Sequence, residues 1–207
     1  MIKSTITDEE KGILTEIASI GVGNASVALG KLTNAKIIIT VPEVNVISAN
    51  DAPGLFSEDI AAIGVCLKVV GMLNGSMIFL FEEEDAKRIS FILNVIDIND
   101  PVMTEEIELN TIKEVANILT GAYLGAVTKF TGLDMLHSVP MVVRGTAAQV
   151  LGSVIKEASD SQIIIVKSKI TIGDAVFRLV GFLLVSLNEE EIKRLIETIK
   201  TKYKYLI

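Results

Sequence analysis

The 207-residue sequence contains one cysteine, one histidine and no tryptophan. Cys66 cannot form an internal disulfide, and Cys66 and His137 together cannot supply the four ligands of a Cys/His zinc site. The sequence therefore predicts no metal among its candidate sites and a reducing, cytoplasmic setting. The lone cysteine, which lies in an apolar run, is expected to be a buried small hydrophobic residue, and the lone histidine to be structural.

Positive charge is also scarce, because 19 Lys and Arg residues face 26 Asp and Glu residues and give a net charge of −7. A protein that neutralises the phosphates of a nucleic acid needs a basic stripe, which this sequence lacks. Its apolar runs are short or interrupted by Lys68 and Arg178, and its first residues contain no apolar signal core. We therefore expect neither nucleic acid nor a membrane as a partner.

Hydrophobic residues make up 50% of the chain, which is enough to bury a sizeable core in a single domain over residues 1–207. The sequence also repeats itself. A shift of 98 residues aligns the segment that begins at Glu16 with the segment that begins at Glu114, and 10 of 29 positions are identical. We interpret the chain as two copies of one unit, at about 1–99 and 100–207.

Periodicity and capping signals predict an α/β (α+β) fold with long helices at 8–32 and 105–130 on one side of a mainly antiparallel sheet. Thr7 and Glu10 form a capping-box pattern, and Pro42 indicates an edge position or a bend for the strand near 36–47. The remaining predicted elements are a hairpin 60–70/76–81 turning at Asn74-Gly75, a helix 83–93, a link 97–104, a strand 136–144, a helix 146–158, a hairpin 163–172/176–187 turning at Gly173-Asp174, and a helix from Glu189.

A polar stripe runs along the second long helix, where Asn110, Glu114, Asn117 and Gly121 fall within an arc of about 60°. A solvated helix face is the ordinary explanation for such a stripe. However, asparagine and glycine are poor helix formers, so a requirement other than helix propensity is expected to have placed them there. The first helix carries the same stripe in altered form, as Glu16, Ser19 and Gly23.

These residues resemble the CheC-type phosphatases of chemotaxis, which are relatives of CheX and of flagellar switch proteins such as FliY. The signature of that family is Asp or Ser, three residues, Glu, two residues, Asn, three residues and Gly, on two long helices related by a pseudo-twofold axis. EVANILTGAY, from Glu114, resembles its second copy, and EIASIGVGNA, from Glu16, its first. The order of strand, hairpin and helix agrees over nearly the whole chain.

The resemblance implies hydrolysis of the aspartyl phosphate of CheY. Because a phosphorylated receiver holds its own Mg²⁺, a helper protein needs no cofactor and only has to orient a water molecule for in-line attack. The carboxamide of Asn117 suits this task, since it can both accept and donate a hydrogen bond without adding negative charge. Glu114 would bind a cation near the phosphorylation site of the partner, and Gly121 would allow close packing or docking.

The sequence also departs from the family pattern. Ser19 replaces the asparagine of the first copy, and the leading Asp or Ser is replaced by Gly12 and Asn110. We therefore assign catalysis to Glu114 and Asn117 only, and expect the first site to be impaired while Glu16 still helps to dock a partner. The alternative is a non-catalytic adaptor that binds CheD or CheY. Because the internal duplication already supplies a twofold arrangement, we expect a monomer.

Overall fold

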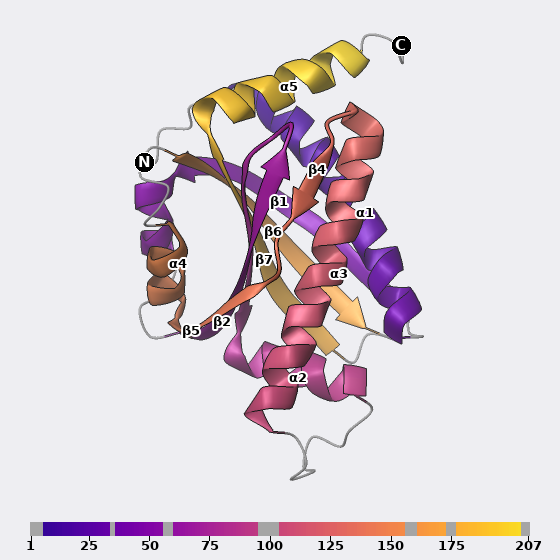
Figure 1. Cartoon of the computed structure of the whole chain (residues 1–207), viewed down its shortest axis with the longest axis vertical. Coiled ribbons are helices and arrows are strands. Elements are labelled where there is room, and N and C mark those ends of the chain that lie inside the picture. The colour runs from indigo at the N-terminus through magenta and orange to yellow at the C-terminus, as the bar shows by residue number, and fades with distance from the viewer. Residues whose placement is uncertain are drawn as a thin grey trace.

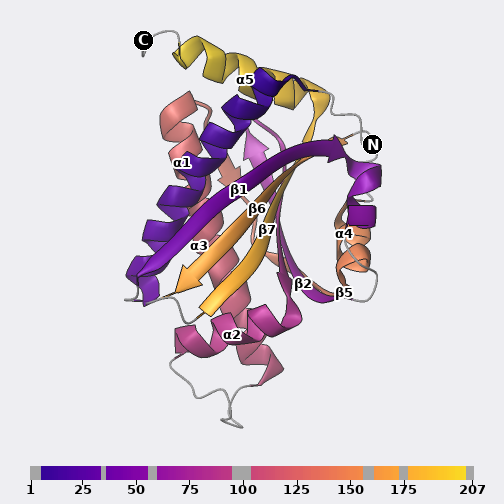
Figure 2. The same cartoon turned by 180° about the vertical axis from the view of Figure 1, so that it is seen from behind.

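The computed structural model describes residues 6–33, 36–55, 60–94, 104–155, 161–172 and 177–203. Within them, seven strands form one antiparallel sheet with the order β1-β6-β7-β3-β2-β4, and β5 also pairs with β2 (Figures 1 and 2). The strands are β1 (Ile37–Ser48), β2 (Ala61–Gly71), β3 (Gly75–Glu82), β4 (Met135–His137), β5 (Met141–Thr146), β6 (Ser161–Ile172) and β7 (Phe177–Asn188). The helices are α1 (Asp8–Thr33), the 3₁₀ helix η1 (Ala49–Leu55), α2 (Glu83–Asn94), α3 (Glu105–Thr131), α4 (Ala147–Ile155) and α5 (Glu189–Tyr203).

The two sequence repeats are interleaved in the sheet. The first strand of the first repeat, β1, pairs with β6 of the second repeat. The first two strands of the second repeat, β4 and β5, pair with β2 of the first repeat. The hairpins β2-β3 and β6-β7 meet at the centre through the pairing of β3 with β7. Each repeat therefore completes the sheet of the other.

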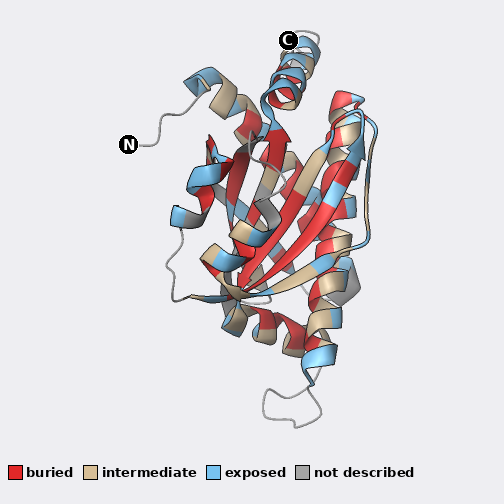
Figure 3. Ribbon diagram, turned by 60° about the vertical axis from the view of Figure 1, so that its left-hand side comes forward, coloured by how far each residue is buried: buried red, intermediate tan, exposed pale blue. Residues whose placement is uncertain are grey.

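The helices cover the two faces of the sheet unequally. Helices α1 and α3 pack against each other and against one face, with α2 and α5 at their ends, and the larger core lies beneath them (Figure 1). Helices η1 and α4 cover a smaller core on the opposite face. The central strands β2 and β3 are buried along most of their length, whereas β4 and β5 contain no buried residue (Figure 3). The predicted arrangement of two long helices on a mainly antiparallel sheet is thus confirmed.

Local signals fix the ends of the two long helices. The backbone N–H of Thr7 donates to Glu10 Oε2 at 2.9 Å, and that of Glu10 donates to Thr7 Oγ1 at 3.3 Å, which is the predicted capping box. Helix α3 begins after Thr104, whose Oγ1 accepts from the N–H of Ile107 at 3.3 Å. It ends at Gly132, which has a φ of 78° and donates its N–H to Thr128 O at 2.7 Å.

Residues 8–31 of α1 are long and apolar enough to cross a membrane, by length and composition alone. In the structure, however, the apolar side of this helix is buried in the main core through residues such as Leu14, Ile17 and Val22. Core helices of soluble proteins meet the same criterion.

Several predicted elements are corrected by the structure. The strand expected at 136–144 is divided into β4 and β5 around Pro140, which cannot donate to a ladder. In β1 the corresponding Pro42 produces only a register shift between Thr40 and Glu43, at the edge of the sheet as predicted. The helix expected at 146–158 is α4, described over Ala147–Ile155, and residues 156–158 lie outside the described ranges; η1 was not predicted.

The predicted hairpin 60–70/76–81 is confirmed as β2 and β3, although Gly75 of the predicted Asn74-Gly75 turn already belongs to β3 and pairs with Val69. The chain reverses over the five residues between them. This longer loop exists because Val70 and Gly71 continue β2 as partners of β4, and Gly71 has a φ of 136°. The predicted turn at Gly173-Asp174 and the link at 97–103 lie outside the described residues.

An ionic cluster fastens the beginnings of α2 and α3 to the sheet edge. Arg144, on β5, donates to Glu83 Oε1 at 2.7 Å and to Glu108 Oε1 at 3.0 Å, and also pairs with Glu105. Glu108 is buried, and its burial raises the pKa of its carboxyl group, whereas the charge of Arg144 opposes that rise. The charge of Arg144 therefore offsets part of the cost of burying this carboxyl group.

We expect Arg144→Ala to lower the free energy of unfolding at pH 7 by about 2 kcal/mol, because a buried charge loses its partner. The loss should be smaller at pH 5. Removing Arg144 removes a charge that lowers the pKa of Glu108, so burial raises this folded-state pKa further in the variant. A carboxyl with a raised folded-state pKa contributes stability that is present below its unfolded pKa and is lost as the pH rises through the folded pKa, so the variant loses more at pH 7 than at pH 5. Urea unfolding at both pH values measures the effect. The double variant Arg144→Ala/Glu108→Gln is the control, and an equal loss for Arg144→Ala at pH 5 and 7 would contradict the assignment.

Candidate functional site

The polar stripe of the second repeat lies on the outer side of α3. Asn110, Glu114 and Gly121 are exposed and Asn117 is half-buried. The opposite side of the helix carries the buried residues of the core, among them Ile112, Val115, Leu119 and Tyr123. The stripe therefore faces away from the sheet, on the exterior of the molecule.

The two candidate catalytic side chains have no partner among the described residues. Across those ranges, neither Glu114 nor Asn117 takes part in a hydrogen bond or an ion pair through its side chain. An exposed carboxylate and a half-buried carboxamide thus lie one turn apart, at i and i+3, on the outer side of α3. They are placed to engage a partner.

The first stripe differs in its chemistry as well as its sequence. Glu16, Ser19 and Gly23 are exposed on α1, at the positions that correspond to Glu114, Asn117 and Gly121. The hydroxyl of Ser19, however, donates to the carbonyl oxygen of Thr15 at 2.8 Å. The only proton of this side chain is thereby used within its own helix, whereas the amide of Asn117 stays free.

Three glycines near the stripes have different surroundings. A Cβ on Gly121 would have the Nε2 of His137 as its nearest neighbour, at 3.7 Å, and a Cβ on Gly23 would meet no atom within 4 Å. A Cβ on the buried Gly21 would overlap Cδ2 and Cε2 of Tyr123 on α3. Close packing of the two long helices therefore depends on Gly21, which was not predicted from the sequence. Gly121, in contrast, lies on the exposed side of α3, where a Cβ would meet no atom of α1 within 4 Å.

The stripe is a surface rather than a pocket. A cavity of about 40 Å³ lies in the core beneath α1, α3 and α5, and it is lined mainly by apolar residues such as Leu14, Met77 and Val127. Neither Glu114 nor Asn117 lines it. Among the described residues, no group of three or more His, Cys, Asp or Glu side chains could hold a metal ion. A helix surface of this shape fits a macromolecular partner better than a small molecule.

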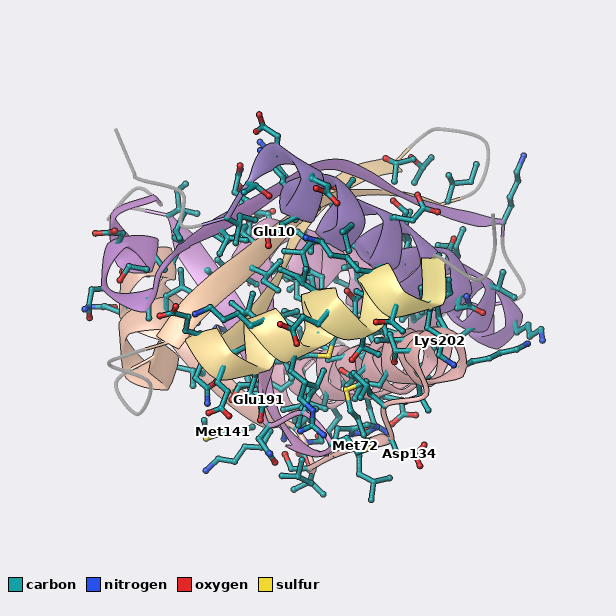
Figure 4. The ribbon with its side chains drawn as sticks, turned by 90° about the horizontal axis from the view of Figure 1, so that it is seen from above. Glu10, Met72, Asp134, Met141, Glu191 and Lys202 are labelled. Carbon is teal, nitrogen blue, oxygen red and sulfur yellow. The ribbon has the colours of Figure 1, made fainter. Side chains whose placement is uncertain are left out.

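Exposed apolar side chains gather on the edge formed by β2, β4 and β5. Met72 and Met141 project on the same side of the molecule as Asp134 (Figure 4). The exposed large apolar residues of this edge are Val70, Met72, Leu136, Val139 and Met141. The second repeat therefore combines a free polar stripe with a partly apolar sheet edge, which is a common composition for an interface.

No family model matches the sequence. The chain is 32% identical over 158 residues to the CheY-P phosphatase CheC of Bacillus subtilis strain 168, and the match covers 73% of this chain and 72% of that relative. The chain belongs to the CheC family. The resemblance found in the Glu114–Asn117 pattern and its altered first copy is thereby confirmed at the level of the family.

Solved structures of this family share the fold. The chain is similar to FliY of Thermotoga maritima, with a TM-score of 0.81 and 19% identity over 96% of this chain and 99% of that chain. It is also similar to a chain in the CheX–CheY–BeF₃–Mg²⁺ complex of Borrelia burgdorferi, with a TM-score of 0.57 and 17% identity over 84% and 99% of the two chains. The predicted CheC-like fold is therefore confirmed.

Proposed function

We propose that this protein is a phosphatase that hydrolyses the aspartyl phosphate of a CheY-like response regulator in chemotaxis signalling. Membership of the CheC family supports the activity, since the B. subtilis relative is named a CheY-P phosphatase. The observation that carries the proposal is the Glu114–Asn117 pair, which lies on the outer surface of α3 and has no side-chain partner among the described residues. Such a surface reaches a phosphoryl group that another protein presents.

Asn117 would act on the attacking water. Its amide oxygen accepts a hydrogen bond from the water, and its amide N–H donates one to a phosphoryl oxygen, so that the water lies in line with the bond to aspartate. The oxygen of the water then bonds to phosphorus, the bond from phosphorus to the aspartyl oxygen breaks, and inorganic phosphate and a free carboxylate result. Mg²⁺ belongs to the receiver, and this chain contributes no cofactor of its own.

Glu114 would fix the register of the complex. An exposed carboxylate one turn before Asn117 can form a charge-assisted hydrogen bond with a lysine or another cation beside the phosphorylation site. The net charge of −7 would favour approach to a basic patch of this kind. Glu114 would therefore dock the receiver while Asn117 carries out the reaction.

The first site would take no part in the reaction. The Ser19 hydroxyl is shorter than an asparagine side chain and is bonded to Thr15, so it cannot reach a phosphoryl group that docks over α1 in the same pose. Misplacing a catalytic group by about 1 Å can cost on the order of 100-fold in rate. Glu16 is left as a docking residue. We expect one catalytic site per chain, in a cytoplasmic protein that acts as a monomer.

The test measures how fast a phosphorylated CheY-like receiver loses its phosphate with and without the protein. Binding is measured in parallel to the BeF₃⁻–Mg²⁺ adduct of the receiver and to the unmodified receiver. We expect faster decay and tighter binding to the adduct. Unchanged decay at concentrations where the adduct binds would instead identify a non-catalytic binding protein, and equal binding to both receiver forms would favour an adaptor for which CheD is the next partner to test.

A further inference from the structure

His137 lies beside the second site, on the side of the sheet that the helices cover. It pairs with the buried Val69 of β2, and its neighbour Leu136 is 73% exposed. Side chains alternate along a strand, so His137 and Met135 project to the same side. Met135 packs against the main core and lines its cavity, which identifies this side as the one that carries α3.

The imidazole of His137 reaches the polar stripe itself. Its Nε2 is the atom nearest to the position that a Cβ on Gly121 would occupy, at 3.7 Å. Gly121 follows Asn117 by four residues, which is about 6 Å along a helix axis. The ring therefore extends the line of Glu114 and Asn117 by one further turn, and the absent side chain of Gly121 leaves it open to the surface.

The other ring nitrogen is already in use. Nδ1 of His137 lies 3.0 Å from the carbonyl oxygen of Ser138. Because a carbonyl can only accept, Nδ1 must carry the proton in this contact, and the Nε2 of a neutral ring is then an acceptor. In the part of the chain that the structure describes, Nε2 has no hydrogen-bond donor of its own.

The first repeat lacks this feature. The residue that corresponds to His137 is Ile39, which packs against the main core, and a Cβ on Gly23 would have no neighbour within 4 Å. The imidazole is therefore present beside Asn117 and absent beside Ser19. A purely structural role does not explain why histidine accompanies Asn117, because the corresponding strand position in the first repeat accepts isoleucine.

We propose that His137 is a docking residue of the second site, where its Nε2 accepts a hydrogen bond from an N–H or O–H group of the phosphorylated receiver. The proposal rests on the proposed function and adds to it a contact outside the Glu-x-x-Asn pair. His137 binds the partner and takes no part in the chemical step. Its loss should therefore raise KM without lowering kcat.

The experiment compares His137→Ala, His137→Gln and the wild-type protein in receiver dephosphorylation. Loss of one hydrogen bond should raise KM by about 3- to 10-fold while kcat stays within about twofold. His137→Gln, which restores an acceptor, should recover most of that loss. Ile38→Ala is the control, because Ile38 is an exposed apolar residue on β1, at the opposite edge of the sheet from β4, and it should leave both constants unchanged.

Affinity for the BeF₃⁻–Mg²⁺ adduct of the receiver separates the two proposals. If the wild type accelerates decay but His137→Ala leaves KM and the affinity unchanged, the docking role is wrong and the phosphatase stands. If the wild type binds the adduct without hydrolysing the phosphate, the phosphatase proposal fails and weaker binding by His137→Ala still supports docking. An equal loss in His137→Gln and His137→Ala overturns the hydrogen bond, and no binding of the wild type to the adduct overturns both proposals.

Discussion

Replacing Asn117 with alanine is expected to slow receiver dephosphorylation by at least about 100-fold, because alanine can neither position the water nor donate to the phosphoryl oxygen. Affinity for the BeF₃⁻–Mg²⁺ adduct should change by less than about threefold, since Glu114 remains to dock the receiver. The decay of the phosphorylated receiver under single-turnover conditions measures the first effect. Equilibrium titration of the adduct measures the second.

Two further variants test whether the effect belongs to the carboxamide at this position of the stripe. Asn110→Ala removes an exposed asparagine from the same stripe, two turns before Asn117, and should leave the rate unchanged. Ser19→Asn restores the carboxamide of the first site beside Glu16 and should raise the total rate in the Asn117→Ala background. Retention of full activity by Asn117→Ala would remove this residue from the mechanism.

Replacing Gly21 with alanine is expected to destabilise the protein by about 3 kcal/mol, near the upper end of what overpacking of a core usually costs. The added methyl group would overlap the ring of Tyr123, which is itself buried against α1, so the two long helices would have to separate. Thermal and urea unfolding measure the loss. Gly23→Ala, two residues later on the same helix, is the control.

Gly23→Ala should raise the free energy of unfolding by about 1 kcal/mol, because alanine is the better helix former. Gly23 is exposed, and its new methyl group would meet no atom within 4 Å. The two substitutions are chemically identical and lie on the same helix, so the opposite signs would isolate the contact with Tyr123. Equal effects of the two variants would mean that Gly21 does not set the distance between the helices.

The long elements could be predicted from the sequence because their signals are local. The Thr7–Glu10 capping box and the Thr104 cap define helix starts within a few residues of chain, and the period of apolar residues defines the buried side. Strand pairing is not local. The exchange of opening strands between the repeats, the division into β4 and β5, and the helix η1 depend on contacts with distant segments.

The stripe was predictable for the same reason, since the positions of Glu114, Asn117 and Gly121 follow from helical geometry alone. Their surroundings were not. Sequence spacing could not show that the Ser19 hydroxyl bonds to Thr15, or that Gly21 rather than Gly121 lies against the neighbouring helix. Nor could it show that His137 lies beside Gly121, because the approach of β4 to α3 brings together residues that are 16 positions apart.

The exchange of opening strands explains why a first copy with an altered site would be retained. Strand β1 supplies a ladder partner to β6, and β2 supplies one to β4 and β5, so deleting the first repeat would strip backbone partners from the repeat that carries Asn117. The first repeat is therefore needed to complete the sheet, whatever the outer face of α1 binds. Side chains on that face can be replaced without breaking these ladders, so a new binding surface can be built on α1 while the second repeat keeps its backbone partners.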